Sequence, residues 1–337
     1  MIRIGIIGAG RIGRVHAEGI QGVRGAKVTA IADPLMNDET AAWAKSMEIP
    51  KVFHDHGEII GDNNIDAVLI CSSTNTHSAI SLEAIEAGKH VFCEKPIDHD
   101  LDKIRSVLNA LALTKTSVKY QVGFQRRFDH NFRAIRRGVQ QGRVGDVHLV
   151  KITSRDPNPP SIPYVKVSGG LFLDMTIHDF DMVRYLSGAE VTEVSAYGAV
   201  LVDPAIGEAG DIDTAAVTLK LTSGGLAVID NSRRAIFGHD QRAEVFGSKG
   251  ALSSFNDSGS NVAFSDAEGV HSEPPLFFFL ERYMQAYRDE IASFVNAIET
   301  DSETEVTAND GLQPVLIGLA ARKSLLEHRP VKVEEIT

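Results

Sequence analysis

The stretch Ile-Arg-Ile-Gly-Ile-Ile-Gly-Ala-Gly-Arg-Ile-Gly, residues 2–13, decides the fold class. Its first half, Ile2–Ile7, is an apolar run typical of a buried strand, and a helical pattern begins at Gly13. In such a unit, Gly8, Gly10 and Gly13 permit a tight turn, a close approach of the backbone to a pyrophosphate, and close packing of the helix on the strand. The stretch therefore predicts a dinucleotide site. The alternative is a glycine-rich turn that binds nothing.

A carboxylate in the next apolar run predicts which dinucleotide binds. This run, residues 28–32, leads to Asp33, twenty residues beyond Gly13, where an acid accepts hydrogen bonds from the adenosine ribose hydroxyls. The same carboxylate repels a 2′-phosphate, so the cofactor is predicted to be NAD rather than NADP. The residues predicted to contact the cofactor in this region are Gly8, Ala9, Gly10, Arg11, Ile12, Gly13 and Asp33.

Apolar runs alternate with helical patterns through the first third of the chain, which predicts a parallel sheet built from βαβ units. After Phe124 the strand-like runs follow one another at short spacing, which favours antiparallel pairing. The predicted fold class is therefore α/β, with an N-terminal Rossmann domain whose parallel sheet is doubly wound. An α+β domain with an open, mainly antiparallel sheet is expected to follow. The predicted domains are residues 1–123, which bind NAD, and residues 124–337, which bind substrate.

Composition restricts the class of partner. The chain has 337 residues, with 34 Lys and Arg against 45 Asp and Glu, so its formal charge is −11. An acidic chain repels phosphate backbones and anionic lipid, which argues against nucleic-acid and membrane partners. The two cysteines, Cys71 and Cys93, form no disulfide framework, and no Cys/His spacing predicts a metal site. We expect a cytoplasmic protein that acts on a small molecule.

Polar residues follow two further runs of the predicted parallel sheet. Ser72, Ser73, Thr74 and His77 come after residues 67–71, and Glu94 and Lys95 come after residues 91–93. Ligands of open α/β sheets bind beyond the carboxyl ends of the strands, so both groups are predicted to face the cofactor. An ammonium at residue 95 would stabilise an oxygen on which negative charge develops. The alternative is a solvated ion pair between Glu94 and Lys95.

A largely apolar helix, predicted over residues 171–186, carries one polar stripe. Asp174, His178 and Asp181 stand at i, i+4 and i+7, on one face of such a helix. A neutral imidazole there can take an alcohol proton while a neighbouring carboxylate orients it. Two alternatives stay open: a structural hydrogen bond between Asp and His, and a catalytic metal, although no further ligand cluster accompanies the pair.

Three motifs in this order resemble the Gfo/Idh/MocA oxidoreductases across the whole chain. They are Gly8-x-Gly10-x-x-Gly13, Glu94-Lys95-Pro96 and Asp174-x-x-x-His178. The longer stretches 123–129, 154–157 and 169–181 are similar to the inositol dehydrogenases of that family. The resemblance implies that the open sheet of residues 124–337 mediates assembly, usually into a homotetramer.

The resemblance also implies a catalytic set of Lys95, Asp174 and His178. His178 would be the acid–base, Lys95 would contact a substrate hydroxyl and the nicotinamide, and Asp174 would bind substrate and support His178. Further substrate or cofactor contacts are expected at Gln125, Arg126 and Asp156, and at His239, which stands where the family commonly has Tyr. The family often has Pro at the position of Ser73.

The implied activity is NAD-dependent oxidation of myo-inositol, a small polyol, to the 2-keto inositol. The same chemistry on scyllo-inositol, another cyclitol or an aldose is the nearest alternative. Two other classes stay open, a non-catalytic NAD-binding sensor and a lyase or glycosidase that recycles tightly held NAD. Loss of Lys95 or His178 would indicate the sensor, but both residues are present.

Overall fold

The computed structural model describes residues 1–114 and 117–337, and this chain divides into two compact units. The first unit consists of Met1–Phe128 and Met284–Val315, and the second of Asp129–Tyr283 and Leu316–Thr337. Two long helices, α11 (Phe279–Thr300) and α12 (Ala308–Glu327), therefore contribute residues to both units. Within the described residues, no helix has the length and hydropathy needed to cross a membrane.

The first unit contains a six-stranded parallel sheet with the order β3-β2-β1-β4-β5-β6. Its strands are β1 (Ile2–Ile7), β2 (Ala26–Ala32), β3 (Lys51–Phe53), β4 (Ala67–Ile70), β5 (His90–Glu94) and β6 (Tyr120–Gly123). In this order the chain starts at the centre of the sheet, builds one half and then crosses over to build the other. The predicted N-terminal Rossmann architecture is confirmed.

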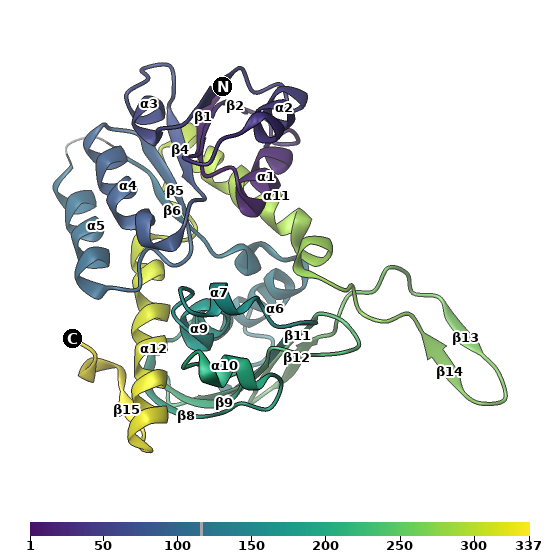
Figure 1. The fold of residues 1–337 in the computed structure, drawn as a ribbon. Helices are drawn as coiled ribbons and strands as arrows, with labels where there is room; N and C mark the ends of the chain where they lie inside the picture. Colours follow the sequence, from purple (N-terminus) through teal and green to yellow (C-terminus); the bar gives the residue numbers. More distant parts are fainter. Residues whose placement is uncertain (115–116) are drawn as a thin grey trace. The chain divides into compact units, whose positions relative to one another are not determined.

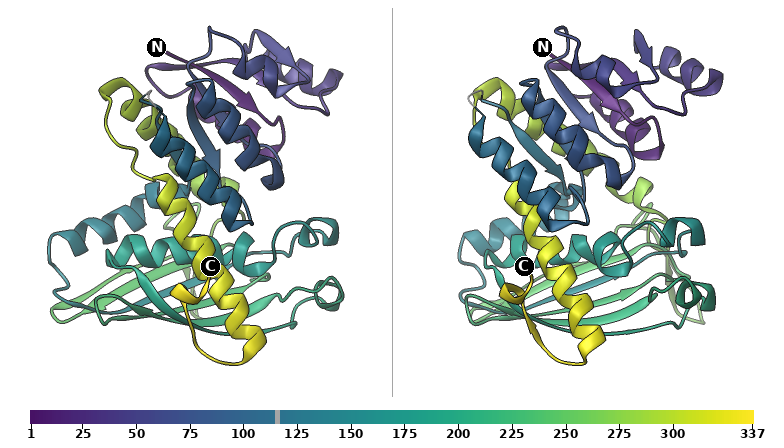
Figure 2. Two further views of the ribbon diagram at one scale, coloured as in Figure 1. Left: turned by 90° about the vertical axis from the view of Figure 1, so that its left-hand side faces the viewer. Right: turned by 60° about the vertical axis from the view of Figure 1, so that its left-hand side comes forward.

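Helices cover both faces of this sheet (Figures 1 and 2). They are α1 (Arg11–Ile20), α2 (Asp38–Ser46), α3 (His56–Ile60), α4 (Thr74–Glu86), α5 (Leu101–Leu113) and the 3-10 turn η1 (Gln125–Phe128). Ile4 and Ile6 of β1 lie in one buried cluster with Ile291 and Phe294 of α11. Gly5, between these two isoleucines, faces the opposite way, where a Cβ would come within 2.4 Å of Ile59 in α3. The period of two along β1 thus places a helix against each face.

The second unit contains a seven-stranded open sheet with the order β12-β11-β7-β10-β9-β8-β15. Its strands are β7 (Val147–Arg155), β8 (Val191–Ala199), β9 (Thr214–Leu221), β10 (Leu226–Ser232), β11 (Asp240–Gly247), β12 (Gly250–Ser254) and β15 (Val331–Lys332). β7 and β10 pair in parallel, and the other neighbours in this order pair antiparallel. This arrangement confirms the predicted mainly antiparallel sheet.

Helices pack on one face of the second sheet. α6 (His130–Gln140) contacts β11 and β12, and α9 (Thr176–Ser187) contacts β7 and β10. Along β9, Val217 and Leu219 are buried while Thr218 and Lys220 are exposed, so the other face is open. The remaining elements are α7 (Ile162–Val165), α8 (Leu171–Asp174), α10 (Pro204–Glu208), the 3-10 turn η2 (Val333–Glu335) and an exposed hairpin of β13 (Ala263–Ser265) and β14 (Val270–Ser272).

The end of one strand and the interruption of one predicted helix in the second unit depend on local backbone geometry. β10 ends at Ser232, because the next backbone groups bond outside the ladder. The Arg233 N–H donates to the Asp213 carbonyl, and the Ala235 N–H donates to the Asp156 carbonyl. The helix predicted over residues 171–186 is interrupted at Met175, between α8 and α9.

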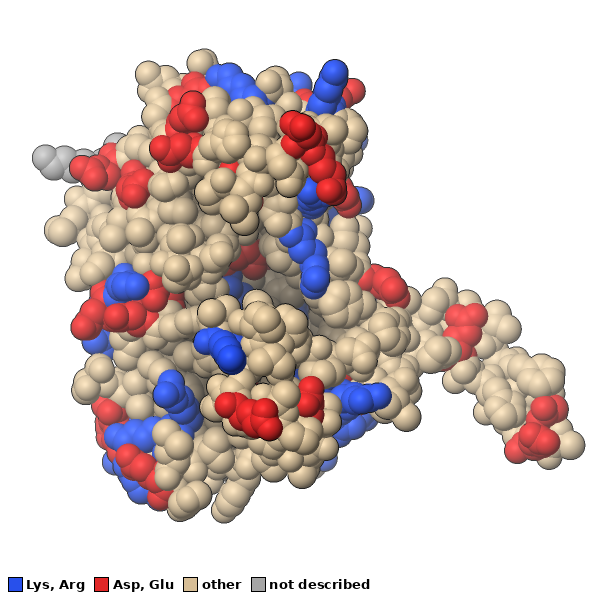
Figure 3. All heavy atoms as spheres, viewed as in Figure 1, with Lys and Arg blue, Asp and Glu red and all other residues tan. Residues whose placement is uncertain are grey.

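Charged side chains of both signs are interspersed over the face shown in Figure 3. The same view shows acidic groups at the tip of the exposed hairpin, which carries Asp266 and Glu268 in its turn. On this face the acidic side chains thus lie among basic ones rather than in one patch.

Candidate cofactor and substrate sites

The glycine-rich turn between β1 and α1 has the geometry that a dinucleotide needs. Gly8 has a φ of +104°, and a Cβ there would come within 2.6 Å of the Cys71 backbone. A Cβ on Gly13 would come within 1.9 Å of the Gly8 carbonyl oxygen, so only glycine allows α1 this close to the turn. At Gly10, in contrast, a Cβ would face open space, where the backbone can approach a pyrophosphate. The turn therefore fits the phosphates of NAD.

Asp33 is joined to this turn by hydrogen bonds. It directly follows β2, its Oδ2 accepts from the Ala9 N–H at 2.7 Å, and its Oδ1 accepts from the Leu35 N–H at 2.8 Å. Each carboxylate oxygen has a second lone pair, so Asp33 can also accept from a ribose hydroxyl. Besides its predicted role toward the ribose, the carboxylate thus fixes the turn itself.

The predicted residues after β4 lie at the start of α4, which begins at Thr74 with Ser73 as its N-cap. Ser72 shares a 2.7 Å hydrogen bond with the Thr76 hydroxyl. The His77 ring is buried, with Nε2 at 3.0 Å from the Ser72 carbonyl and Nδ1 at 2.8 Å from the Pro96 carbonyl. His77 therefore ties the segment after β4 to the segment after β5.

Both ring nitrogens of His77 face carbonyl oxygens, which favours the doubly protonated imidazolium. Burial opposes the charge. Interaction with the Cys93 sulfur and hydrogen bonds to the Pro96 and Ser72 carbonyls outweigh burial and raise the pKa of His77 from 6.5 to about 9. His77 thus acts as a cationic brace between two strand ends. Its predicted direct contact with the cofactor stays a prediction.

Glu94 is the last residue of β5, and Lys95 follows it directly. The Glu94 carboxylate lies 2.6 Å from Nε2 of His16 in α1, and its side chain is only 12% exposed. It is therefore an interior carboxylate rather than half of a solvated surface pair. The ladder between β5 and β6 places Glu94 opposite Gly123, where a Cβ would come within 3.1 Å of the carboxylate.

Gln125 and Arg126, two of the predicted contact residues, lie in η1 just after β6. Both are buried. Because β4, β5 and β6 are parallel neighbours, the residues that follow them lie along one edge of the sheet. The first unit thus brings the predicted residues after β4, Lys95, Gln125 and Arg126 to the edge predicted for the cofactor.

The second unit gathers three of the predicted substrate residues, Asp156, Asp174 and His239, around an arginine. Arg233 is 3% exposed, and its Nη2 donates to Asp174 Oδ2 at 2.9 Å. Its Nη1 lies 3.7 Å from Asp156, whose other oxygen lies 3.6 Å from Nε2 of His239. Asp174 Oδ1 also accepts from the Tyr164 hydroxyl at 2.8 Å. Burial alone would lower the pKa of Arg233, but Asp174 and Asp156 raise it.

Sequence reasoning missed Arg233 and Tyr164 as members of this cluster. Arg233 stands 59 residues after Asp174 in the chain, and Tyr164 lies in a proline-rich loop, so local periodicity does not connect them. One feature of the sequence could have indicated a base such as Arg233. Asp156 and Asp174 are both predicted at the substrate site, and buried carboxylates require a cation nearby.

The polar stripe predicted on one helix is divided by the break at Met175. Asp174 ends α8, whereas His178 and Asp181 are buried in α9. Asp181 lies 3.8 Å from Arg184, one turn further along the same helix. Asp174 therefore belongs with Arg233, and Asp181 belongs to a different ion pair.

A second acid in α9 takes part in a structural network. Asp179 Oδ2 accepts from Nδ2 of Asn231 at 2.8 Å, and the Asn231 amide oxygen accepts from the Thr176 hydroxyl at 2.6 Å. Nδ2 of Asn231 also lies 3.2 Å from the Ser154 carbonyl. These bonds link the start of α9 to β10 and β7, and so fix the turn of helix that carries His178.

Among the residues that the structure describes, two groups of acids and histidines lie close enough together to hold a metal ion. Asp129, His130 and Asp257 form one, but Nη1 of Arg282 contacts both Asp129 and Asp257, so a cation already occupies it. The other group contains His16, Glu94 and Glu290 and lies in the interior of the first unit.

Family comparison agrees with this geometry. Residues 2–124 match the oxidoreductase family with an NAD-binding Rossmann fold, and residues 132–253 match the GFO/IDH/MocA C-terminal domain. The chain belongs to this family of oxidoreductases, and it is an NAD-dependent dehydrogenase. The resemblance in the three motifs is confirmed.

Individual proteins of the family are similar to this chain over nearly its full length. Over 98% of this chain and 96% of its own length, the uncharacterized oxidoreductase YrbE of Bacillus subtilis is 50% identical. Myo-inositol 2-dehydrogenase of Thermotoga maritima is 47% identical over 99% of both chains. Inositol 2-dehydrogenase of Rhizobium meliloti is 46% identical over 98% of this chain and 99% of its own.

Solved structures have the same fold. The crystal structure of a probable dehydrogenase from Thermotoga maritima superposes with a TM-score of 0.97 over the full length of both chains, at 47% identity. Scyllo-inositol dehydrogenase from Lactobacillus casei, with bound NAD(H) and scyllo-inositol, has a TM-score of 0.91 at 34% identity and covers 99% of each chain.

Proposed function

We propose that this protein oxidises myo-inositol to the 2-keto inositol with NAD, as an inositol 2-dehydrogenase. The observation that carries the proposal is the buried polar cluster around Arg233. A cyclic polyol presents hydroxyl groups in several directions, and each needs a donor or an acceptor. Asp156 and Asp174 offer acceptors, while Arg233, His239 and Tyr164 offer donors. Near-full-length identity of 46–47% to two inositol dehydrogenases supports this substrate.

The proposed mechanism assigns one task to each residue of the catalytic set. NAD, held by the glycine-rich turn and Asp33, supplies the hydride acceptor when it is bound. A ring nitrogen of His178 takes the hydroxyl proton. Asp174, kept ionised by Arg233 and oriented by Tyr164, binds substrate and supports the imidazolium that forms. The Lys95 ammonium stabilises the negative charge on the hydroxyl oxygen.

The remaining predicted residues complete the substrate site. Gln125, Arg126, Asp156 and His239 are assigned to contacts with the substrate. Ser72, Ser73, Thr74, His77 and Glu94 are assigned to the cofactor side. No metal takes part in this mechanism, because the ammonium and the imidazole provide the charge stabilisation and the base that it requires.

The nearest rival is the same oxidation of scyllo-inositol, another cyclitol or an aldose. The scyllo-inositol dehydrogenase compared above is 34% identical, against 46–47% for the myo-inositol and inositol 2-dehydrogenases, which favours the myo isomer. A panel of cyclitols and sugars with NAD and with NADP, followed by absorbance of the reduced cofactor, decides between them. Accumulation of NADH with myo-inositol is expected. Failure of every cyclitol would remove the inositol assignment, and absence of net NADH would favour a lyase that recycles NAD.

Lys95→Ala tests the assigned chemistry. Because the ammonium acts on charge that develops in the transition state, its loss is expected to lower kcat by about 100- to 1,000-fold. NAD binding, measured by protein fluorescence, should persist. Lys45→Ala, at an exposed position of α2, is the matched control. Activity of the Lys95 variant within a few-fold of wild type would show that the role is wrong.

We further propose a cytoplasmic homotetramer that takes part in inositol breakdown. The free thiols of Cys71 and Cys93 fit a reducing compartment. The open face of the second sheet exposes Leu226, Val228 and Phe246, which a partner subunit would cover. Light scattering after size-exclusion chromatography should give four times the mass of one chain, and a monomer would contradict the assembly.

A further inference from the structure

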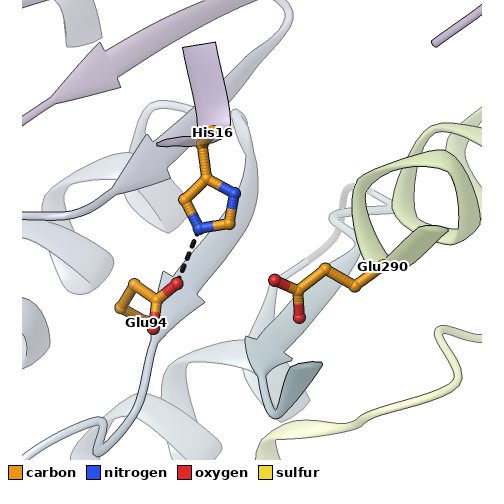
Figure 4. A group of neighbouring side chains, drawn as sticks. All are labelled: His16, Glu94 and Glu290. Carbon is orange, nitrogen blue, oxygen red and sulfur yellow. Dashed lines mark hydrogen bonds and ion pairs between the residues drawn. The ribbon is translucent and has the colours of Figure 1, made fainter. Parts of the chain in front are cut away.

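Three ionisable side chains meet in the interior of the first unit, each from a different element. His16 comes from α1, Glu94 from the end of β5 and Glu290 from α11. One nitrogen or oxygen of each lies within 4.8 Å of the others, and Figure 4 shows the three side chains directed at one another. His16 and Glu290 are fully buried. The cluster lies beside the peptide that leads into Lys95.

Two of the three groups share a proton. His16 Nε2 and Glu94 Oε1 are 2.6 Å apart, the separation of a hydrogen bond between charged or strongly polar groups, with Nε2 as the donor. The His16 ring packs in T-shaped contacts against Phe92, at 5.1 Å between centroids, and against Tyr287, at 5.6 Å. The imidazole therefore cannot turn away from Glu94 without losing its packing.

Glu290 has a different environment. Neither of its carboxyl oxygens has a hydrogen-bond partner among the residues that the structure describes. Its backbone is fixed, because Nε2 of Gln121 donates to the Glu290 carbonyl at 2.8 Å. Burial and the nearby Glu94 carboxylate raise the pKa of Glu290 well above its usual value. An ionised carboxylate without a partner would cost several kcal/mol in this interior, so the uncharged acid is favoured.

Within the described part of the chain, the other ionisable groups near Glu290 supply no counter-ion. Burial and the Glu94 carboxylate raise the pKa of Cys71, which directly follows β4, so this thiol stays protonated. The Cys93 sulfur lies 3.3 Å from the Glu94 carbonyl. His16 directs its proton to Glu94, and the Tyr287 ring makes a T-shaped contact with His16.

The geometry favours a proton over a metal ion in this cluster. Two ligands of one tetrahedral zinc ion lie about 3.3 Å apart, given zinc–ligand bonds of about 2.0–2.1 Å. The 2.6 Å between His16 Nε2 and Glu94 Oε1 is too short for that arrangement and matches a hydrogen bond.

We propose that Glu290 is a buried, uncharged carboxylic acid that places no second negative charge beside Glu94, so that the hydrogen bond from His16 holds Glu94 in place and positions Lys95. Lys95 is the next residue after Glu94, so the anchored carboxylate fixes the strand end from which the ammonium extends. The inference rests on the proposed function for the role of Lys95. The protonation of Glu290 is independent of that function.

Glu290→Gln tests the protonation by thermal unfolding between pH 5 and pH 8. Above about pH 4.3 the unfolded chain releases the Glu290 proton and the folded chain keeps it, so stability falls as pH rises. Glutamine has no proton to release. The variant is expected to have a flatter Tm profile than wild type and an equal or higher Tm at pH 8. Glu299→Gln, an exposed position on the same helix, is the matched control and should follow wild type.

His16→Phe tests the positioning. Phenylalanine keeps the aromatic packing and removes the proton donor to Glu94. Misplacement of a catalytic group is expected to lower kcat about 10- to 100-fold, while the KM for NAD stays within about threefold. Glu290→Gln, the conservative variant, should retain kcat within about threefold because it keeps an uncharged group of the same shape.

Several results would overturn the proposal. A Tm profile of Glu290→Gln as steep as that of wild type, or a lower Tm at pH 8, would show that Glu290 is ionised. A stoichiometric divalent metal that is present in wild type and absent from the variant would make the cluster a metal site. Failure of both Glu290→Gln and Glu290→Met to fold would show that no uncharged group replaces it. An unchanged kcat in His16→Phe would remove the positioning role.

The two proposals fail separately. Thermal unfolding and metal content need no substrate, so they test Glu290 even if no cyclitol is oxidised. If cyclitols are oxidised and the Tm profiles of wild type and Glu290→Gln coincide, the proposed function stands. The uncharged state proposed for Glu290 is then wrong.

Discussion

His77 is expected to make the stability of the protein depend on pH between about 6.5 and 9. Its two ring nitrogens face the Ser72 and Pro96 carbonyls, and its pKa is raised from 6.5 to about 9. In this interval the folded protein keeps a proton that the unfolded chain releases. Stability is therefore fully present below about pH 6.5 and is lost as pH rises toward 9.

The size of the effect follows from the shift. At about 1.4 kcal/mol per pKa unit, the loss in the free energy of unfolding is about 3 kcal/mol. For a unit of this size, such a loss lowers Tm by about 6–12 °C. His77 is buried, so little of this energy is lost to solvent screening.

The assay compares thermal unfolding of wild type and His77→Gln at pH values from 6 to 9.5. Glutamine can donate to one of the two carbonyls and carries no charge, so the variant should be less stable at pH 6 and nearly equal to wild type at pH 9. The difference between the two profiles isolates His77 from Glu290, which contributes equally to both. His54→Gln, at an exposed position, is the control. If the Tm difference between wild type and His77→Gln stays constant across this pH range, His77 does not carry the stabilising charge.

Two further substitutions test the cofactor turn and the polar cluster. Asp33→Ala removes the acceptor for both the Ala9 N–H and the ribose. The KM for NAD should therefore rise about 10- to 100-fold, and the preference for NAD over NADP should decrease. An unchanged preference would contradict this role of Asp33. Arg233→Met leaves Asp156 and Asp174 without their buried cation and should lower the urea-measured free energy of unfolding by about 3–5 kcal/mol. The exposed neighbour Arg234→Met should cost less than about 0.5 kcal/mol, and equal losses in both variants would exclude the charge argument.

The features that the sequence predicts well are those fixed by local geometry. Two of the three glycines in the turn are required by local geometry, because Gly8 has a positive φ and a Cβ on Gly13 would come within 1.9 Å of the Gly8 carbonyl oxygen. Buried strands of the parallel sheet contain continuous apolar runs, and β9 alternates as an open sheet requires. Such constraints act within a few residues, so they are visible in the chain.

Features that depend on distant partners were not predictable in the same way. Residues 284–315 join the first unit, where Ile291 and Phe294 of α11 enter the core beside β1. The periodicity of α11 shows that one face is apolar but does not identify the sheet that covers it. The break at Met175 was hidden for a related reason, because residues 171–186 are compatible with one helix and only tertiary contacts divide them.

The carboxyl groups near the proposed sites show why residue type alone does not assign a role. Asp174 faces the Arg233 guanidinium and the Tyr164 hydroxyl, so it stays an anion and accepts hydrogen bonds. Glu290 faces another carboxylate and has no partner among the described residues, so it keeps its proton. In the sequence both are acids within apolar helical segments. Their opposite charge states arise from neighbours that the fold brings from other parts of the chain, and those neighbours decide which acid serves the substrate and which serves the scaffold.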